Sequence, residues 1–161
     1  MDNNQEILKQ AEFLYDATVK LIYNLALYTI GNSSMAEQIT TDAFCDAFYR
    51  VTDRSDIELF MKKAIREVYK HGRKIKRLSY CSGLLCMDTN AGARRLLAAL
   101  LDLDYNERYI ILLFCWLRLS PKEIARIICL PTFLVKKRLY TSIRKLGFQS
   151  RENVACISKS I

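Results

Sequence analysis

The chain has little glycine, little proline and no long apolar run. Of its 161 residues only 5 are Gly and 2 are Pro, which argues against a β-rich protein with many tight turns. No stretch approaches the roughly 18 to 20 uninterrupted apolar residues of a membrane span, and the first residues lack the basic-then-apolar order of a signal peptide. At 51% apolar residues the chain is too hydrophobic to be disordered. These features predict a mostly helical, cytoplasmic protein with no membrane insertion.

Residues that could form a catalytic or metal centre are also sparse. The six cysteines fit neither a disulfide framework nor a pair of C-x-x-C metal knuckles. The only histidine, His71, stands in a run of Lys and Arg, where a phosphate contact or a solvated ring is the simpler interpretation. We therefore expect no catalytic centre, no metal and no cofactor. An enzyme that uses Cys and His is the opposing hypothesis, and a metal assay would test it.

Positive charge is concentrated in two separate blocks. The formal net charge is +8. Residues 1–59 carry 4 basic against 10 acidic side chains, residues 60–80 carry 8 against 1, and residues 120–147 carry 7 against 1. Each basic block coincides with strong helical periodicity, which favours two surfaces for a polyanion over one basic tail.

Two helices are predicted in the acidic region. The first extends from about Glu6 to Ile30 and ends at Gly31. Ser34 and Glu37 have the spacing of a capping box and predict the start of the second. Its expected buried stripe is Ala36, Ile39, Ala43, Ala47 and Val51. Its opposite face is acidic and polar, with Glu37, Gln38, Thr41, Asp42 and Asp46.

A third helix carries the first basic block. Ser55 and Glu58 repeat the capping-box spacing at its expected start. The predicted core positions are Ile57, Met61, Ala64, Val68 and Ile75. The other face is basic, with Lys62, Lys63, Arg66, Lys70, Arg73, Lys74 and Arg77. Cations beside the rings of Phe60 and Tyr69 would suit single-stranded nucleic acid, in which bases stack on aromatic side chains. The two rings could equally be edges of the core.

The second basic block has the pattern of a helix-turn-helix. Ser120, Pro121 and Glu123 combine an N-cap hydroxyl, a proline at the first helical position and a capping-box carboxylate. A short helix with Ile124, Ala125 and Ile128 buried is then expected, followed by a turn at Cys129, Leu130 and Pro131 and a second helix with Val135, Leu139, Ile143 and Leu146 buried. The second helix carries Lys136, Lys137, Arg138, Arg144 and Lys145. A basic second helix after a short turn is typical of DNA recognition in the major groove.

Two stretches together resemble the compact group-four sigma factors of bacterial RNA polymerase, the extracytoplasmic-function type. The stretch from Ala36 through Asp42 to Phe48 is similar to that family's polymerase-binding helix, D-A-E-D-L-x-Q-E-x-F. The stretch from Leu119 to Leu139 is similar to its second motif, S-x-E-E-I-A-x-x-L-G-x-P-x-x-T-V-K-x-R-L. The motifs stand in the family's order, and the resemblance covers about residues 8–147.

The resemblance implies an all-α fold of two small helical domains. Residues 1–77 would form a domain like sigma-70 region 2, and residues 94–148 a helix-turn-helix domain like region 4. Residues 78–93 would be the linker and residues 149–161 a tail.

The resemblance also implies a function. The chain would bind core RNA polymerase, at the clamp helices of the largest subunit and at the flap, and direct recognition of the minus-10 and minus-35 promoter elements and transcription initiation. An anti-sigma factor is an implied partner. The implied polymerase-binding residues are Glu37, Gln38, Thr41 and Asp42. The implied DNA-binding residues are Phe60, Lys62, Lys63, Arg66, Tyr69, Lys70, Arg73, Lys74, Arg77, Thr132, Lys136, Lys137, Arg138, Tyr140 and Arg144.

The chain departs from the family pattern at several positions. Met35 and Gln38 replace acidic residues, Glu67 replaces an asparagine near the expected melted DNA, and Cys129 replaces the turn glycine. The alternative is therefore a free-standing helix-turn-helix DNA-binding transcriptional regulator with a degenerate sigma fold. Binding to core RNA polymerase would distinguish the two hypotheses.

Overall fold

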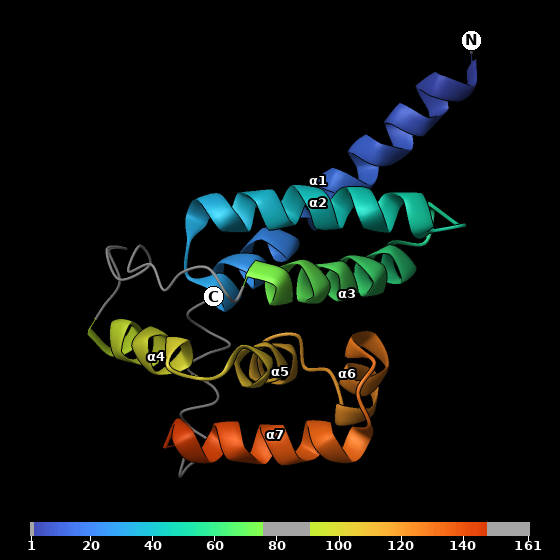
Figure 1. Ribbon diagram of the computed structural model, residues 1–161. Helices are drawn as coiled ribbons and strands as arrows, with labels where there is room; N and C mark the ends of the chain where they lie inside the picture. The colour runs from blue at the N-terminus through green and yellow to red at the C-terminus, as the bar shows by residue number, and fades with distance from the viewer. Residues whose placement is uncertain (1, 76–90, 148–161) are drawn as a thin grey trace. The chain divides into compact units, whose positions relative to one another are not determined.

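The computed structural model describes residues 2–75 and 91–147, and the expected all-α fold is confirmed there (Figure 1). Within these ranges it has no strand. The helices are α1 (Asp2–Ile30), α2 (Ser33–Arg50), α3 (Ile57–Ile75), α4 (Ala91–Leu101), α5 (Tyr105–Cys115), α6 (Pro121–Ile128) and α7 (Thr132–Lys145). The predicted DNA contact Arg77, most of the predicted linker and the predicted tail 149–161 lie outside the described residues.

Contacts divide the chain into two compact units. The first comprises Met1–Leu27 and Ser33–Ser79, and so contains α2, α3 and most of α1. The second comprises Tyr28–Asn32 and Tyr80–Ile161, and contains α4 to α7. We call them unit 1 and unit 2. Their assignment as sigma-type domains stays a prediction.

The core of unit 1 is built on the small-residue face of α2. All five positions of the predicted α2 stripe are buried, as expected. Small side chains there, and Ala64 and Gly72 on α3, allow the two helices to pack closely. On α1 the expected start was wrong, because the helix begins at Asp2 and not near Glu6; its fully buried side chains include Leu14, Ile22 and Leu25. Gly31, with φ +80°, ends α1 as predicted.

Two predicted helix caps were wrong. Helix α2 begins at Ser33, so Ser34 lies inside its first turn and is not its N-cap. The backbone N–H of Leu59 donates to the Asp56 carboxylate at 2.9 Å, which makes Asp56 the cap of α3. Ser55 is unavailable because its backbone N–H and hydroxyl both donate to the carboxylate of Asp53. A local Asx turn therefore replaces the expected capping box.

Unit 2 is organised around α5. This helix is buried on nearly all sides and packs against both α6 and α7. Its buried Arg108 donates hydrogen bonds at 3.0 Å to the carbonyl oxygens of Leu100 and Leu103, at and just beyond the end of α4. The Leu100 carbonyl also accepts from the backbone N–H of Leu103 at 3.2 Å. The guanidinium adds donors at the end of α4, where helical N–H partners run out, and is itself satisfied there.

Candidate nucleic-acid interface

Helix α6 begins with the predicted capping box. The backbone N–H of Ser120 donates to the Glu123 carboxylate at 2.8 Å, and the N–H of Glu123 donates back to the Ser120 hydroxyl at 3.3 Å. Pro121 occupies the first turn, where no backbone donor is needed. The predicted buried residues of this helix, Ile124, Ala125 and Ile128, are all buried. The local sequence thus fixes where the short helix starts and which side of it faces the core.

The turn between α6 and α7 is held by a left-handed residue that is not glycine. Cys129 has φ 53° and ψ 47°, and its backbone N–H donates to the Ala125 carbonyl. The N–H of Leu130 donates to the same carbonyl at 3.1 Å. A residue with a side chain in this conformation costs about 1–2 kcal/mol. The turn therefore forms without glycine, but it lowers the stability of the fold by this amount. Pro131 then precedes α7, with no side-chain cap.

Helix α7 has one buried and one exposed side. Val135, Leu139 and Ser142 face the core, whereas the predicted Ile143 and Leu146 are only half-buried. The exposed side carries the predicted DNA contacts Lys136, Lys137, Tyr140 and Arg144, with the half-buried Thr132 at its start. Phe133, which is not among the predicted DNA contacts, is 68% exposed beside them. The sequence could have indicated this exposure, because Phe133 stands four residues before Lys137 and so lies on the same side of the helix. We call this set the α7 outer face.

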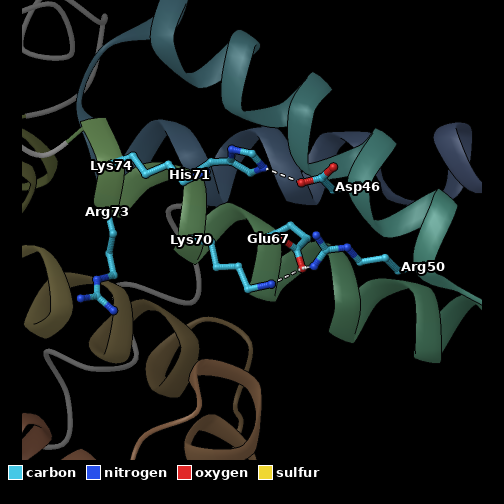
Figure 2. Close-up of a pocket in the computed structure, with 7 residues that line it drawn as sticks. All are labelled: Asp46, Arg50, Glu67, Lys70, His71, Arg73 and Lys74. Carbon is cyan, nitrogen blue, oxygen red and sulfur yellow. Dashed lines mark hydrogen bonds and ion pairs between the residues drawn. The ribbon is translucent and has the colours of Figure 1, made fainter.

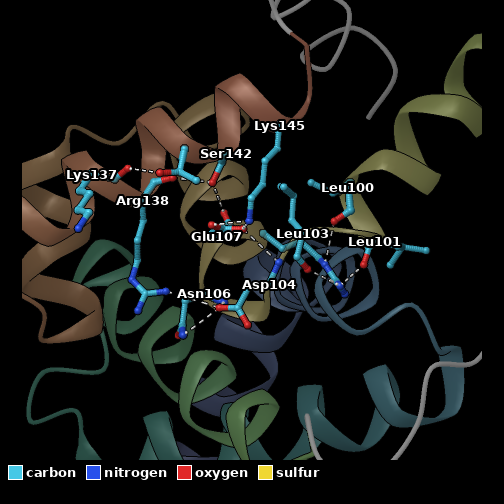
Figure 3. A network of polar contacts seen from close by, with 12 residues as sticks. Leu100, Leu101, Leu103, Asp104, Asn106, Glu107, Lys137, Arg138, Ser142 and Lys145 are labelled. Carbon is cyan, nitrogen blue, oxygen red and sulfur yellow. Dashed lines mark hydrogen bonds and ion pairs between the residues drawn. The ribbon is translucent and has the colours of Figure 1, made fainter.

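Two other cations of α7 turn back onto α5 (Figure 3). The Arg138 guanidinium lies 3.5 Å from the Asp104 carboxylate, and the Lys145 ammonium lies 2.7 Å from that of Glu107. The Ser142 hydroxyl donates to the Glu107 carbonyl at 3.4 Å. Arg138 was predicted as a DNA contact, and the structure gives it a protein partner.

In unit 1, the predicted polymerase-binding side chains lie together on α2. Glu37, Gln38, Thr41 and Asp42 are all exposed, as expected from their spacing. Glu37 and Thr41 also border a shallow, mainly apolar groove between α1 and α2, to which Tyr15 and Phe44 contribute their rings, 5.5 Å apart. The face therefore combines an acidic group with aromatic side chains.

The expectation that Phe60 and Tyr69 face nucleic acid is contradicted. Phe60 is fully buried and its ring packs 5.1 Å from that of Phe44, while Tyr69 is only 3% exposed. Phe60 belongs to the core because it stands four residues before the buried Ala64, and Tyr69 because it stands four residues after the buried Ile65. Base stacking in unit 1 cannot rely on these two side chains as placed.

Half of the predicted α3 cations within the described residues are engaged. Lys62 pairs with Glu58 at 2.5 Å, Lys70 with Glu67 at 2.7 Å, and the Arg73 guanidinium lies 5.5 Å from the centre of the Tyr69 ring. Lys63 and Arg66 are half-buried, and Lys74 is exposed. The basic side of α3 therefore offers fewer unpaired cations than its sequence suggests.

A charged pocket between α2 and α3 explains how the carboxylate of Glu67 can be buried (Figure 2). The Glu67 side chain is 3% exposed, and Arg50 and Lys70 both donate to its Oε1, at 3.0 and 2.7 Å. Next to it, His71 is hydrogen-bonded to Asp46 at 3.0 Å. His71 is thus neither a free phosphate contact nor a solvated ring. The hydrogen bond with His71 is also the main reason that the pKa of Asp46 lies below its usual value.

The same pocket contains the group of described residues that could hold a metal ion. Donor atoms of Asp46, Glu67 and His71 lie within 4.8 Å of one another. Arg50 and Lys70 already neutralise Glu67, however, so the cluster is charge-compensated by the protein itself. Additional positive charge there would be repelled.

The described cysteines do not form a site with the histidine. Cys45 and Cys129 are exposed on α2 and in the turn after α6, and Cys115 is buried in α5. Burial raises the pKa of the Cys115 thiol to about 11, so it is not a thiolate at neutral pH. Among the described residues, none of the three borders the pocket that contains His71.

No helix in the described parts of the chain combines the length and hydropathy needed to cross a membrane. No protein-family model matches the chain, and no curated protein matches it.

Proposed function

We propose that the chain is a sigma-type promoter-recognition factor. In this proposal it acts in the cytoplasm, binds core RNA polymerase and promoter DNA, and has no catalytic centre or cofactor of its own. The observation that carries the proposal is the helix pair α6–α7, in which a capped short helix and the turn at residues 129–131 present the cations and rings of the α7 outer face.

The α7 outer face has the chemistry of a major-groove reader. Its first turn holds Thr132 and Phe133, which can contact base edges and thymine methyl groups at the minus-35 element. Lys136, Lys137 and Arg144 lie further along the exposed side and would contact phosphates, which fix the position of the helix. Tyr140 lies between them.

Unit 1 would supply the second promoter contact and the polymerase contact. The exposed cation Lys74 and the half-buried Lys63 and Arg66 would bind the backbone of the minus-10 strand without base stacking on Phe60 or Tyr69. The exposed α2 residues Glu37 and Asp42 would bind the clamp helices of the polymerase. The flap would contact unit 2, and an anti-sigma factor would cover these surfaces when transcription is off.

Salt-dependent binding to duplex DNA tests the α7 outer face. We expect Lys136→Ala and Lys137→Ala each to flatten the plot of log affinity against log salt concentration by about 0.9, the value for one lost phosphate contact. Lys122→Ala, an exposed lysine on α6, is the matched control and should change the slope less. Unchanged slopes in both α7 variants would exclude α7 as the DNA-binding helix.

Co-migration with core RNA polymerase separates the proposal from the free-standing regulator. We expect the chain to co-migrate with the polymerase in gel filtration, and Glu37→Lys or Asp42→Lys to weaken this. Glu12→Lys, the same charge reversal at an exposed position of α1, is the control. DNA binding without any polymerase binding would favour the regulator. Run-off transcription on genomic fragments would then identify the promoters of a true sigma factor.

A further inference from the structure

The start of α5 has two structural roles. Asp104 and Glu107 form the capping box of α5, and each also pairs with a cation of α7. Both carboxylates, and both α7 cations, lie within unit 2. Figure 3 shows Arg138 and Lys145 extending from α7 toward these two acidic side chains.

The two ion pairs differ in how easily they can be broken. Lys145 lies 2.7 and 2.9 Å from the two oxygens of Glu107, whose side chain is 10% exposed. Arg138 lies 3.5 Å from Asp104, and both side chains are more than a third exposed, at 38% and 36%. A long, solvated ion pair is weak and reversible. The Glu107 pair is therefore an anchor, and the Asp104 pair is exchangeable.

We propose that Asp104 competes with DNA phosphate for Arg138 and thereby limits the affinity of α7 for DNA. The inference rests on the proposed function. Carboxylate and phosphate oxygens accept the same guanidinium hydrogen bonds, so Asp104 stands in for a phosphate while the protein is free. DNA binding then either leaves Arg138 on Asp104 or must break the pair, and in both cases one cation contributes less than its full electrostatic share.

The substitution Asp104→Asn isolates this competition. Asparagine caps helices as well as aspartate does, so α5 keeps its N-cap while the negative charge is lost. Binding of the full chain to a short mixed-sequence duplex would be measured by fluorescence anisotropy over a series of salt concentrations. We expect the affinity to rise about three- to tenfold near 0.1 M salt and the log–log slope to steepen by about 0.9, because Arg138 is released for phosphate.

Two further variants exclude a general effect of charge. Asp102→Asn removes an exposed carboxylate two residues away and changes the net charge equally, so a clearly smaller gain is expected. Arg138→Ala should have little effect in the native chain and should abolish the gain in the Asp104→Asn chain. Circular dichroism would verify that each variant is folded.

The outcomes separate the inference from the proposed function. If the native chain binds duplex DNA through Lys136 and Lys137 but Asp104→Asn gains no more than Asp102→Asn, the competition is refuted and the proposed function stands. A gain that persists after Arg138→Ala also refutes it. If neither the native chain nor any variant binds duplex DNA, the proposed function and the inference both fail.

Discussion

Helices α3 and α7 carry the two basic blocks of the chain, and they use their cations differently. On α3, Lys62 and Lys70 pair with carboxylates and Arg73 lies against a ring. On α7, Lys136, Lys137 and Arg144 are exposed and form no ion pair within the described parts of the chain. The other described cations of α3 are Lys63 and Arg66, which are half-buried, and Lys74, which is exposed. The difference between the two helices therefore lies in exposure, because the cations of α7 without an ion pair are all exposed, whereas two of those of α3 are half-buried.

The aromatic residues of the two units also differ in burial. The largest change in the free energy of unfolding is expected from a substitution that tests this difference. Phe60 is buried in unit 1 and Phe133 is exposed in unit 2. We expect Phe60→Ala to lower the free energy of unfolding by about 3–5 kcal/mol, because it removes a ring from the core. Phe133→Ala should change it by less than about 0.5 kcal/mol. Urea unfolding followed by circular dichroism measures both, and equal losses would show that the division is wrong.

A smaller loss of stability is expected when the buried carboxylate that pairs with Arg50 and Lys70 is replaced. Glu67→Gln keeps the shape of the buried side chain but removes the charge that Arg50 and Lys70 share. We expect a loss of about 1–2 kcal/mol, moderated because both cations can still be solvated. Glu58→Gln, at an exposed pair on the same helix, is the control and should cost under about 0.5 kcal/mol. Similar losses in both variants would contradict a special role for Glu67.

The turn before α7 offers a stabilising change. Cys129→Gly removes a side chain from a left-handed residue, and we expect the chain to gain about 1 kcal/mol in the free energy of unfolding. Cys45→Gly makes the same exchange within α2 and should instead destabilise, because glycine is a poor helix former. Differential scanning calorimetry would record Tm shifts of opposite sign. A lower Tm for Cys129→Gly would mean that the side chain contributes more than the strain costs.

The smallest expected effect is a pH dependence confined to unit 1. The pKa of Asp46 is below its usual 3.8, chiefly through the hydrogen bond with His71. A carboxyl with a depressed pKa in the fold stabilises the protein above its usual pKa, and this stability is lost as the pH falls through the folded value. Asp46→Asn should therefore lose less stability than the native chain between pH 5 and about pH 3. An equal loss of stability in the native chain and in Asp46→Asn over this range, measured by urea unfolding at each pH, would contradict the role of the Asp46–His71 hydrogen bond.

Sequence patterns predicted elements best where the signal was local. The Ser120 capping box, the Gly31 stop and the buried stripe of α2 depend on residues a few positions apart, and all three were confirmed. The cap of α3 was missed because Asp53 engages Ser55 first. The burial of Phe60 was detectable, since Phe60, Ala64, Val68 and Gly72 form one row at four-residue steps. The role of the residues in polymerase or promoter binding remains a prediction.

The remaining features depend on residues far apart in the sequence. Arg138 and Asp104 are separated by 34 positions, and Arg50 and Glu67 by 17. Periodicity assigns each of these side chains to a helix face but does not reveal its partner. Whether a cation on a basic helix is available to a ligand was therefore decided by the fold.

We expect the apolar run of α5 at residues 109–115 to matter while the protein is being synthesised. Helix α5 leaves the ribosome before α6 and α7, the helices that cover it. Until Val135 and Leu139 have emerged, the apolar side chains of α5 lack their cover in the nascent chain. Such exposed apolar surface favours aggregation and binding by chaperones. Slow translation between α5 and α7 would prolong this exposure, so codon choice over residues 116–139 is expected to influence the yield of folded protein.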